Sequence, residues 1–236
     1  MAKRKWRWSL PLAMFFLFMV SPMAYGDLYS EWVQITKGVP GLPNGTRIVK
    51  TYYTSNAFRA DIGEEIMIMD FDSMIMYQLN TKDGTYTKSN INETDLMPER
   101  DGEEIQAFQQ MLKKVIESLQ IDPTNETKTI SGYVCRKHNA TLMLVDVGEY
   151  WLSKDVVGYK ELRMIADKMA NVFEKDPVLK HLNIAGVVDK LDGFPVQMVI
   201  KATRGTTTIT LKSIKKKPLS KNLFKVPEGY TIKQIN

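Results

Sequence analysis

The chain has 236 residues, of which 44% are hydrophobic and 25% charged, with one Cys, two His and a net charge of +5. These fractions are those of an ordinary globular protein, which excludes disordered, collagen-like, coiled-coil and disulfide-stapled chains. Four basic residues lie within the first seven positions, and beyond residue 26 the chain has 28 basic and 27 acidic residues. This even balance gives no overall electrostatic footprint for nucleic acid.

The first 26 residues have the three parts of a secretory signal peptide. A basic stretch at 3–7 precedes an apolar run at 10–20, and Ala24-Tyr25-Gly26 supplies small residues for cleavage. The apolar run has 11 residues, whereas a helix that crosses a bilayer needs about 20, so we favour cleavage near Gly26 over an uncleaved anchor. We expect residues 1–26 to be a signal peptide and residues 27–236 to form one periplasmic or secreted domain.

Short β-like runs separated by turn residues fill the sequence from residue 30 to residue 90. The separators are rich in Gly, Pro, Asn and Asp, as in Lys82-Asp83-Gly84. None of them is long enough for the crossover that parallel neighbours need, so the pattern predicts an antiparallel meander. The expected strands are 31–36, 46–54, 57–62, 65–71, 74–80 and 85–90.

Two later segments change to helical periodicity. The first runs over 101–119, where Asp101 and Glu104 suit a reciprocal N-cap and Pro123 lies just past the end. Its apolar face is Ile105, Phe108, Leu112, Val115 and Leu119. The second runs over 158–175, with the apolar face Tyr159, Leu162, Ile165, Met169 and Val172. Both stripes predict amphipathic helices.

Further strand-like runs follow each helix, at 126–130, 133–140, 141–147, 149–153, 195–203 and 206–217. Both expected helices have one apolar face and are inserted into a series of antiparallel strands. This arrangement indicates a sheet with helices on one side. We therefore predict an α+β fold that is mainly antiparallel β, with an open curved sheet or incomplete β-barrel of about 11 strands. Two amphipathic helices are expected to cover its concave face.

Several segments resemble a family of uncharacterised secreted bacterial domains. They are 70–86, 130–137 (Ile-Ser-Gly-Tyr-Val-Cys-Arg-Lys), 151–155 (Trp-Leu-Ser-Lys-Asp), 191–195 (Leu-Asp-Gly-Phe-Pro) and 223–230. That family is similar in fold to the LolA-like periplasmic lipoprotein carriers, in which helices cap the concave face of an unclosed antiparallel barrel. The resemblance implies a hydrophobic cavity that takes acyl chains. Relatives of the same fold include sensors and an enzyme, so the fold does not settle activity.

Methionines gather in one expected hairpin. If Asp72-Ser73 is a two-residue turn, Met69 faces Met76 across the ladder and all four methionines of the hairpin share one face of the sheet. Flexible thioethers suit a wall that adapts to varied ligands, although Met also fills ordinary cores. Met198 and Ile200, from an apolar run that alternates with polar residues near the C-terminal end, would form a second wall. The expected ligand-cavity residues are Met67, Met69, Phe71, Met74, Met76, Met198 and Ile200.

The C-terminal part is basic, because residues 201–236 have nine Lys and Arg and a single acidic residue, Glu228. Lys215, Lys216 and Lys217 could face anionic lipid headgroups or an envelope partner. The alternative is a solvated edge whose lysines discourage aggregation.

Little in the sequence suits catalysis or metal binding. Cys135 and His138 lie three positions apart on one expected strand and would point to opposite faces, so they do not form a metal site. A buried strand thiol is the simplest interpretation of Cys135, with a reactive thiol as the alternative. The chain has no phosphate-binding loop, nucleophile elbow or dinucleotide fingerprint, so we expect no cofactor and no enzyme activity.

The sequence therefore predicts an extracytoplasmic binding or carrier protein that holds a lipid or lipoprotein acyl chain. The alternative is a sensor or interaction module on the same fold that binds a membrane or envelope protein partner. Neither hypothesis involves nucleic acid.

Overall fold

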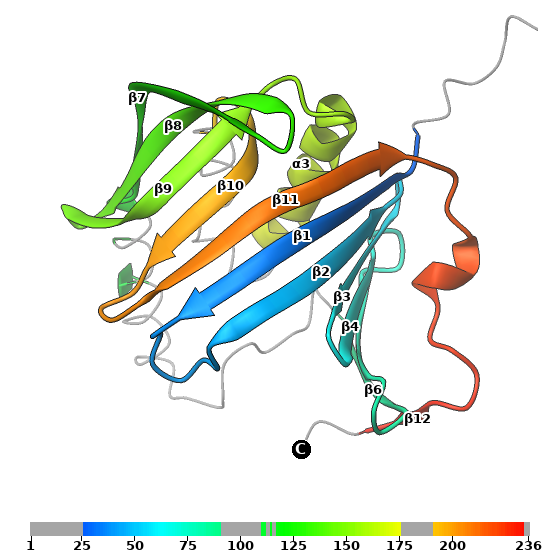
Figure 1. Cartoon of the computed structure of the whole chain (residues 1–236). Coiled ribbons are helices and arrows are strands. Elements are labelled where there is room, and N and C mark those ends of the chain that lie inside the picture. The colour runs from blue at the N-terminus through cyan, green and yellow to red at the C-terminus, as the bar shows by residue number, and fades with distance from the viewer. Residues whose placement is uncertain (1–25, 91–109, 112–113, 115–116, 176–190, 234–236) are drawn as a thin grey trace, which may run out of the picture.

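The computed structural model describes residues 26–90, 110–111, 114, 117–175 and 191–233, which form one twelve-stranded sheet with a long helix against it (Figure 1). The first six strands are β1 (Leu28–Lys37), β2 (Gly45–Tyr53), β3 (Ala57–Ile62), β4 (Glu65–Asp70), β5 (Ile75–Asn80) and β6 (Thr85–Asn90). The later elements are β7 (Gln120–Ile130), β8 (Tyr133–Leu142), β9 (Val145–Ser153), α3 (Tyr159–Lys175), β10 (Phe194–Lys201), β11 (Thr206–Lys216), the 3-10 helix η2 (Lys221–Phe224) and β12 (Thr231–Ile232).

The strand order is β12-β6-β5-β4-β3-β2-β1-β11-β10-β9-β8-β7. The first six strands are neighbours in chain order, which confirms the predicted antiparallel meander. Strand β1 also pairs with β11 and so joins the two halves of the sheet. Helical crossovers are not needed between these neighbours, because antiparallel strands can be joined by short turns.

The structure differs from the expected strands at three places, and the first is β7, which begins at Gln120, six residues before the run expected at 126–130. The runs expected at 133–140, 141–147 and 149–153 form only two strands, β8 and β9, because the chain turns at Met143 and Leu144. A twelfth strand, β12, was not expected, and it pairs in parallel with the start of β6. A two-residue strand carries almost no period of its own, so its sequence gives no signal.

The expectation of two helices on the concave face is supported for one helix. Helix α3 matches the helix expected at 158–175 and packs on the inner side of the sheet. The helix expected at 101–119 lies largely outside the described residues; within that range Gln110, Met111, Lys114 and Glu117 are helical. In the described part of the chain, no helix is both long enough and apolar enough to cross a bilayer.

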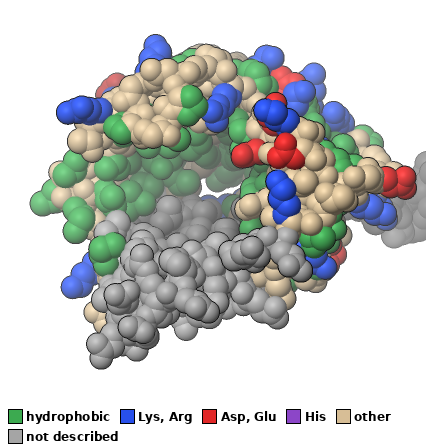
Figure 2. Space-filling model, turned by 90° about the horizontal axis from the view of Figure 1, so that it is seen from below, with side chains coloured by type: hydrophobic (Ala, Val, Ile, Leu, Met, Phe, Trp, Pro, Cys, Tyr) green, Lys and Arg blue, Asp and Glu red, His purple; other side chains and the backbone are tan. Residues whose placement is uncertain are grey.

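The sheet curves into an open arch, and hydrophobic side chains gather along its inner side (Figure 2). Alternate residues of β1 point inward, so Leu28, Ser30 and Trp32 are all buried. Leu28 and Trp32 share the main core with residues of β7 to β11, with Val156 just before the helix and with Leu162 in its first turn. Fully burying one such apolar side chain stabilises the fold by about 1.5 to 3 kcal/mol.

The outer side of β3 to β6 is covered by the C-terminal segment 217–233. Phe224 and Tyr230 of this segment pack against the cluster of Ile66, Ile68 and Leu79. The Arg59 guanidinium donates a hydrogen bond to the Leu223 carbonyl oxygen at 2.7 Å, and the same side chain forms an ion pair with Asp61. This part of the sheet is therefore buried on its outer side by residues more than 130 positions away in sequence.

Five turns meet at one end of the sheet because the strands on either side of each turn are antiparallel. They are residues 38–44, 63–64, 81–84, 143–144 and 202–205, and we call this end the rim. Two of these turns, 38–44 and 202–205, lie at the lower left of Figure 1. The first and last of the five turns touch through glycine backbone: a Cβ on Gly205 would lie 2.1 Å from the Lys37 carbonyl oxygen. Only glycine fits this approach.

Candidate ligand-binding face

The methionine hairpin has the predicted register. Met69 pairs with Met76 across β4 and β5, and Met67 lies on the same face two residues earlier. The turn itself differs from the expected two-residue turn, because residues 71–74 form a four-residue connection. Asp70 Oδ1 accepts hydrogen bonds from the amides of the two central turn residues, Asp72 and Ser73, at 2.9 and 3.1 Å. This local capping fixes the turn.

The methionines of this hairpin form one cluster, which we call the methionine cluster. Its buried members are Phe58, Ala60 and Met69, and partly buried around them are Tyr53, Met67, Phe71, Met74 and Met76. Met69 is only 6% exposed and forms part of the packed centre. Met67 is half-buried at the edge of the cluster. The cluster thus contains both a filled core and a surface that still borders open space.

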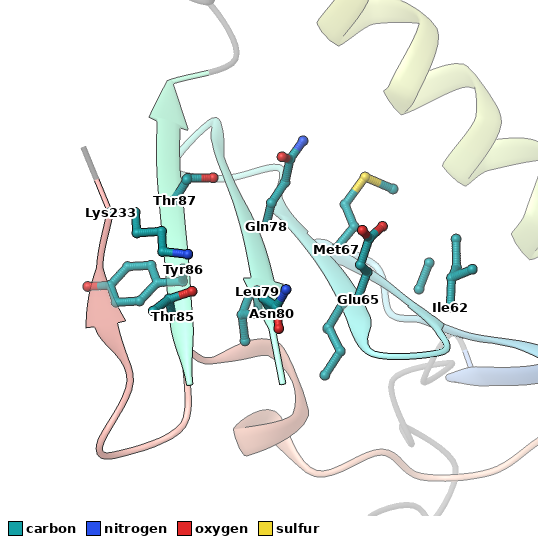
Figure 3. A pocket seen from close by; sticks show the side chains of 12 residues that line it. Ile62, Glu65, Met67, Gln78, Leu79, Asn80, Thr85, Tyr86, Thr87 and Lys233 are labelled. Atoms are coloured by element: carbon teal, nitrogen blue, oxygen red, sulfur yellow. The ribbon is translucent and has the colours of Figure 1, made fainter. Parts of the chain in front are cut away.

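A pocket of about 370 Å³ lies beside the methionine cluster at the rim, which we call the rim pocket (Figure 3). Met67 and Gln78 point into the side of the sheet that faces α3, whereas Leu79 points to the opposite side. Ala60 and Ile62 add apolar surface. The polar lining residues Glu65, Asn80, Thr85 and Lys233 lie at or next to strand ends, and Gln78 and Thr87 add polar side chains from within β5 and β6.

A second pocket of about 180 Å³ lies under α3, between the helix and the β2–β3 turn, and we call it the helix pocket. Met164 and Ile165 of the helix line it together with Tyr53. The Lys168 ammonium at its edge donates to the Ser55 carbonyl oxygen. Burial raises the pKa of the Tyr53 phenol, so this group is neutral at physiological pH.

Tyr53 joins the helix pocket to the methionine cluster. Its ring lies 5.2 Å from that of Phe58, centroid to centroid, within the methionine cluster, and the same residue lines the helix pocket. Met67 lines the rim pocket from the other end of the cluster. The inner face therefore has a continuous apolar track from the rim pocket, across the methionine cluster, to the helix pocket.

Met198 and Ile200 lie on the same face of the sheet but in its other half. Met198 pairs with Ile209, and Ile209 pairs with Gln34 of β1, which has the same orientation as buried Trp32. Ile200 is 46% exposed and lies at the rim. The structure therefore does not bring these two residues into the methionine cluster.

Tyr53, Phe58 and Met164 were missing from the residues expected from sequence. Tyr53 and Phe58 lie on separate strands, and only the pairing of Tyr53 with Phe58 across β2 and β3 reveals their common face. Ile165 had a signal, because it belongs to the apolar stripe of the helix. Met164 has none, since it lies one position off that stripe.

Two of the three lysines expected to face a membrane or partner have contacts within the chain. The Lys216 ammonium donates to Glu161 of α3 at 2.5 Å, and this hydrogen bond lowers the pKa of the Glu161 carboxyl. Lys217 lies over the Tyr29 ring at 4.0 Å from its centroid. Lys215 is exposed. All three lie at the end of the sheet opposite the rim, since β11 begins at the rim.

Cys135 is fully buried in the main core and donates a weak hydrogen bond to the Tyr133 carbonyl oxygen. Burial raises the pKa of its thiol. His138 is also buried, and its Nδ1 lies 3.3 Å from the Arg136 carbonyl oxygen. Among the residues that the structure describes, His, Cys, Asp and Glu side chains form no group of three suited to a metal ion.

Residues 42–230 match a single family, described as a domain of unknown function, DUF4412. The chain belongs to the DUF4412 family. The match spans the methionine cluster, α3 and the C-terminal segment over the outer face, and it confirms the predicted membership of an uncharacterised family. No curated protein is close enough in sequence to count as a relative of this DUF4412 chain.

Solved structures similar to this DUF4412 domain are remote. PNGF-II shares 14% identity and a TM-score of 0.38, covering 88% of this chain and 30% of PNGF-II, so the chain spans about a third of that protein. The MucA/MucB complex of Pseudomonas aeruginosa shares 9% identity and a TM-score of 0.36, covering 86% of this chain and 56% of the matched chain. A putative outer membrane lipoprotein-sorting protein domain from Vibrio parahaemolyticus shares 10% identity and a TM-score of 0.34, covering 86% of this chain and 90% of the matched chain.

Proposed function

We propose that this protein is an extracytoplasmic binding protein that holds an apolar ligand, such as a lipid or the acyl part of a lipoprotein. The observation that carries the proposal is the continuous apolar track on the inner side of the open sheet. Met side chains are flexible and polarisable, so a wall rich in them adapts to chains of different length and shape. Concave, mainly apolar pockets with a few polar groups are the usual form of small-molecule sites.

The polar residues at the two ends of the track fit an amphipathic ligand. Glu65, Asn80 and Thr85 line the rim pocket at the mouth, and Glu161 and Lys168 line the helix pocket. An acyl chain lies along the methionines between them, and its polar group stays near one mouth, where water and side chains satisfy its hydrogen bonds. The proposal assigns no catalytic residue.

The extracytoplasmic location rests on the basic, apolar and small-residue pattern of residues 1–26. Mass analysis of the exported protein tests it: we expect a chain that begins close to Asp27. Retention of Met1 in the exported protein would contradict cleavage.

Binding is tested by paired substitutions in the methionine cluster. Met67→Gln places an amide at the border of the rim pocket, where water can solvate it, so we expect weaker binding of a fluorescent fatty acid with little change in stability. Met69→Gln is the matched control, because the same change at a 6% exposed position leaves a buried amide unpaired. We expect that variant to lose about 2 kcal/mol or more of unfolding free energy.

Probe titration and urea unfolding of both variants decide the question. Unchanged probe affinity in the stable Met67→Gln variant rules out the rim pocket as the ligand wall. No probe binding by the unmodified protein, together with recovery of a specific protein by crosslinking, would favour an interaction module over a ligand carrier.

A further inference from the structure

The rim ends in a projecting apolar turn between β8 and β9. Leu142 pairs with Val145, so Met143 and Leu144 are the two residues of a tight hairpin turn. Leu144 is 92% exposed, and Met143 and Val145 are more than half exposed. Three consecutive large apolar side chains therefore project into solvent, which is unusual for a turn.

The backbone of this turn makes the choice of residues more informative. Both Met143 and Leu144 have positive φ, 49° and 66°. Tight hairpin turns of this kind favour Asn-Gly or Asp-Gly, because large side chains disfavour the left-handed conformation. The Met143 amide donates to Ser118 Oγ at 3.1 Å, so the backbone of the turn is held while its side chains point outward. Folding alone would favour small polar residues at these positions.

Other exposed apolar side chains belong to the same end of the sheet. Leu42 lies in the β1–β2 loop, Ile62 ends β3 and Ile200 lies next to the last residue of β10, and each is more than a third exposed. With the β8–β9 turn they give this end of the sheet a series of exposed apolar side chains, and of these only Ile62 lines the rim pocket. Exposed apolar patches of this kind mark interaction sites.

Charge divides the rim into two parts, because the 63–64 and 81–84 turns have the acidic residues Glu64 and Asp83 beside Lys82, whereas the segments around the other three turns are mainly basic. The three neighbouring segments 37–47, 142–146 and 200–206 have four basic residues, Lys37, Arg47, Lys201 and Arg204. Their single acidic residue, Asp146, is paired with Lys201 at 2.6 Å. Apolar side chains that project beyond a ring of net positive charge match the layers of an anionic bilayer, with headgroups outside and acyl chains within.

We propose that the basic part of the rim, made of the β1–β2, β8–β9 and β10–β11 turns, docks on an anionic lipid surface, with Met143, Leu144 and Val145 inserted between the acyl chains and the four basic residues at the headgroups. This surface is distinct from Lys215–Lys217, which lie at the opposite end of the sheet. The proposal stands apart from apolar-ligand binding, because vesicle binding and probe binding in solution are measured separately.

The test replaces the turn by the residues that its backbone prefers. Met143→Asn together with Leu144→Gly removes the apolar projection and should leave the unfolding midpoint unchanged or higher. We expect co-sedimentation with phosphatidylglycerol-containing vesicles to weaken more than about tenfold, since each inserted side chain contributes through its apolar area. Val134→Thr is the control, because Val134 and Val145 are both 63% exposed but only Val145 lies at the rim.

Charge reversal separates the two basic ends. Lys37→Glu with Arg204→Glu should weaken vesicle binding by about fivefold per lost cation. Added salt should weaken vesicle binding by the unmodified protein, because it screens the charges. Lys215→Glu with Lys217→Glu should leave binding unchanged. Every variant keeps the same N-terminal segment, so differences between them report the substitutions alone.

A fluorescent reporter shows insertion directly. Trp at the turn, in Leu144→Trp, should shift its emission to the blue and be quenched by brominated lipids in anionic vesicles, whereas Val134→Trp should not. Equal vesicle binding by the Asn-Gly turn variant, binding lost only in the Lys215/Lys217 variant, or no emission shift in Leu144→Trp would each overturn the proposal.

Discussion

Two glycines with nearly the same backbone conformation lie in very different surroundings. Gly158 and Gly63 have φ of 77° and 63°. A Cβ on Gly158 would lie 2.5 Å from Leu28 Cδ2, and Leu28 is fully buried. A Cβ on Gly63 would meet nothing within 4 Å. The first glycine therefore permits the close packing of the helix start on β1, and the second only a turn.

Alanine at each position separates the two effects. Gly63→Ala should cost about 1 kcal/mol, the backbone penalty alone. Gly158→Ala should cost about 1 to 3 kcal/mol more, because Leu28 cannot move aside in a filled core. Urea unfolding of both variants measures the difference. Equal losses would show that the helix start tolerates a methyl group.

The buried thiol gives a second prediction at the level of a single residue. Cys135 is fully buried, so disulfide reagents cannot reach its sulfur. Burial also raises the pKa of the thiol and so lowers the fraction of the reactive thiolate. We expect the native protein to react with such a reagent only at the rate of its unfolding, and the denatured protein to react at once. Rapid modification of the native protein would instead support the reactive-thiol interpretation.

At the level of elements, the C-terminal segment 217–233 stabilises the part of the sheet formed by β3 to β6. Phe224 packs against the buried Ile66–Ile68–Leu79 cluster on the outer side. Phe224→Ala should lower the unfolding free energy by about 1 to 3 kcal/mol, less than for a fully buried Phe because this ring is only partly buried. It should also speed proteolysis within 217–233. Lys225→Ala, one position later and exposed, is the control and should change neither.

For the whole molecule, ion pairs make the fold sensitive to acid. The hydrogen bond from Lys216 lowers the pKa of Glu161 from its ordinary 4.5. The hydrogen bond from Lys201 lowers the pKa of Asp146 in the same way. For a lowered pKa, the stabilisation is complete above the ordinary pKa and is lost as pH falls through the folded value. Stability should therefore fall below about pH 4.5.

The Glu161–Lys216 pair can be measured within that loss. Glu161→Gln should lower stability at pH 7 by about 0.2 to 1 kcal/mol, the range of solvent-accessible pairs. The difference from the unmodified protein should shrink as pH falls through the lowered pKa of Glu161, because the protonated carboxyl, like the Gln amide, is neutral. Thermal melts across this range provide the measurement, and a constant difference at all pH values would place the effect of the substitution elsewhere.

Local sequence patterns were sufficient to predict the elements with a strong period. Strands β3 and β6 have the bounds expected at 57–62 and 85–90, and Met69 pairs with Met76 as predicted. In each case alternation along the strand and a nearby turn set the structure, so a few neighbouring residues contain the information.

Which of these residues border open space depends on the packing of distant strands. Met67 and Met69 have the same alternation, yet Met69 packs against Phe58 and Met67 lines a pocket, because partners on other strands differ around them. Lys216 contacts Glu161 from 55 positions away, and the rim unites five turns spread from residue 38 to residue 205. Such contacts depend on how distant strands are ordered in the sheet, and no local pattern encodes that order.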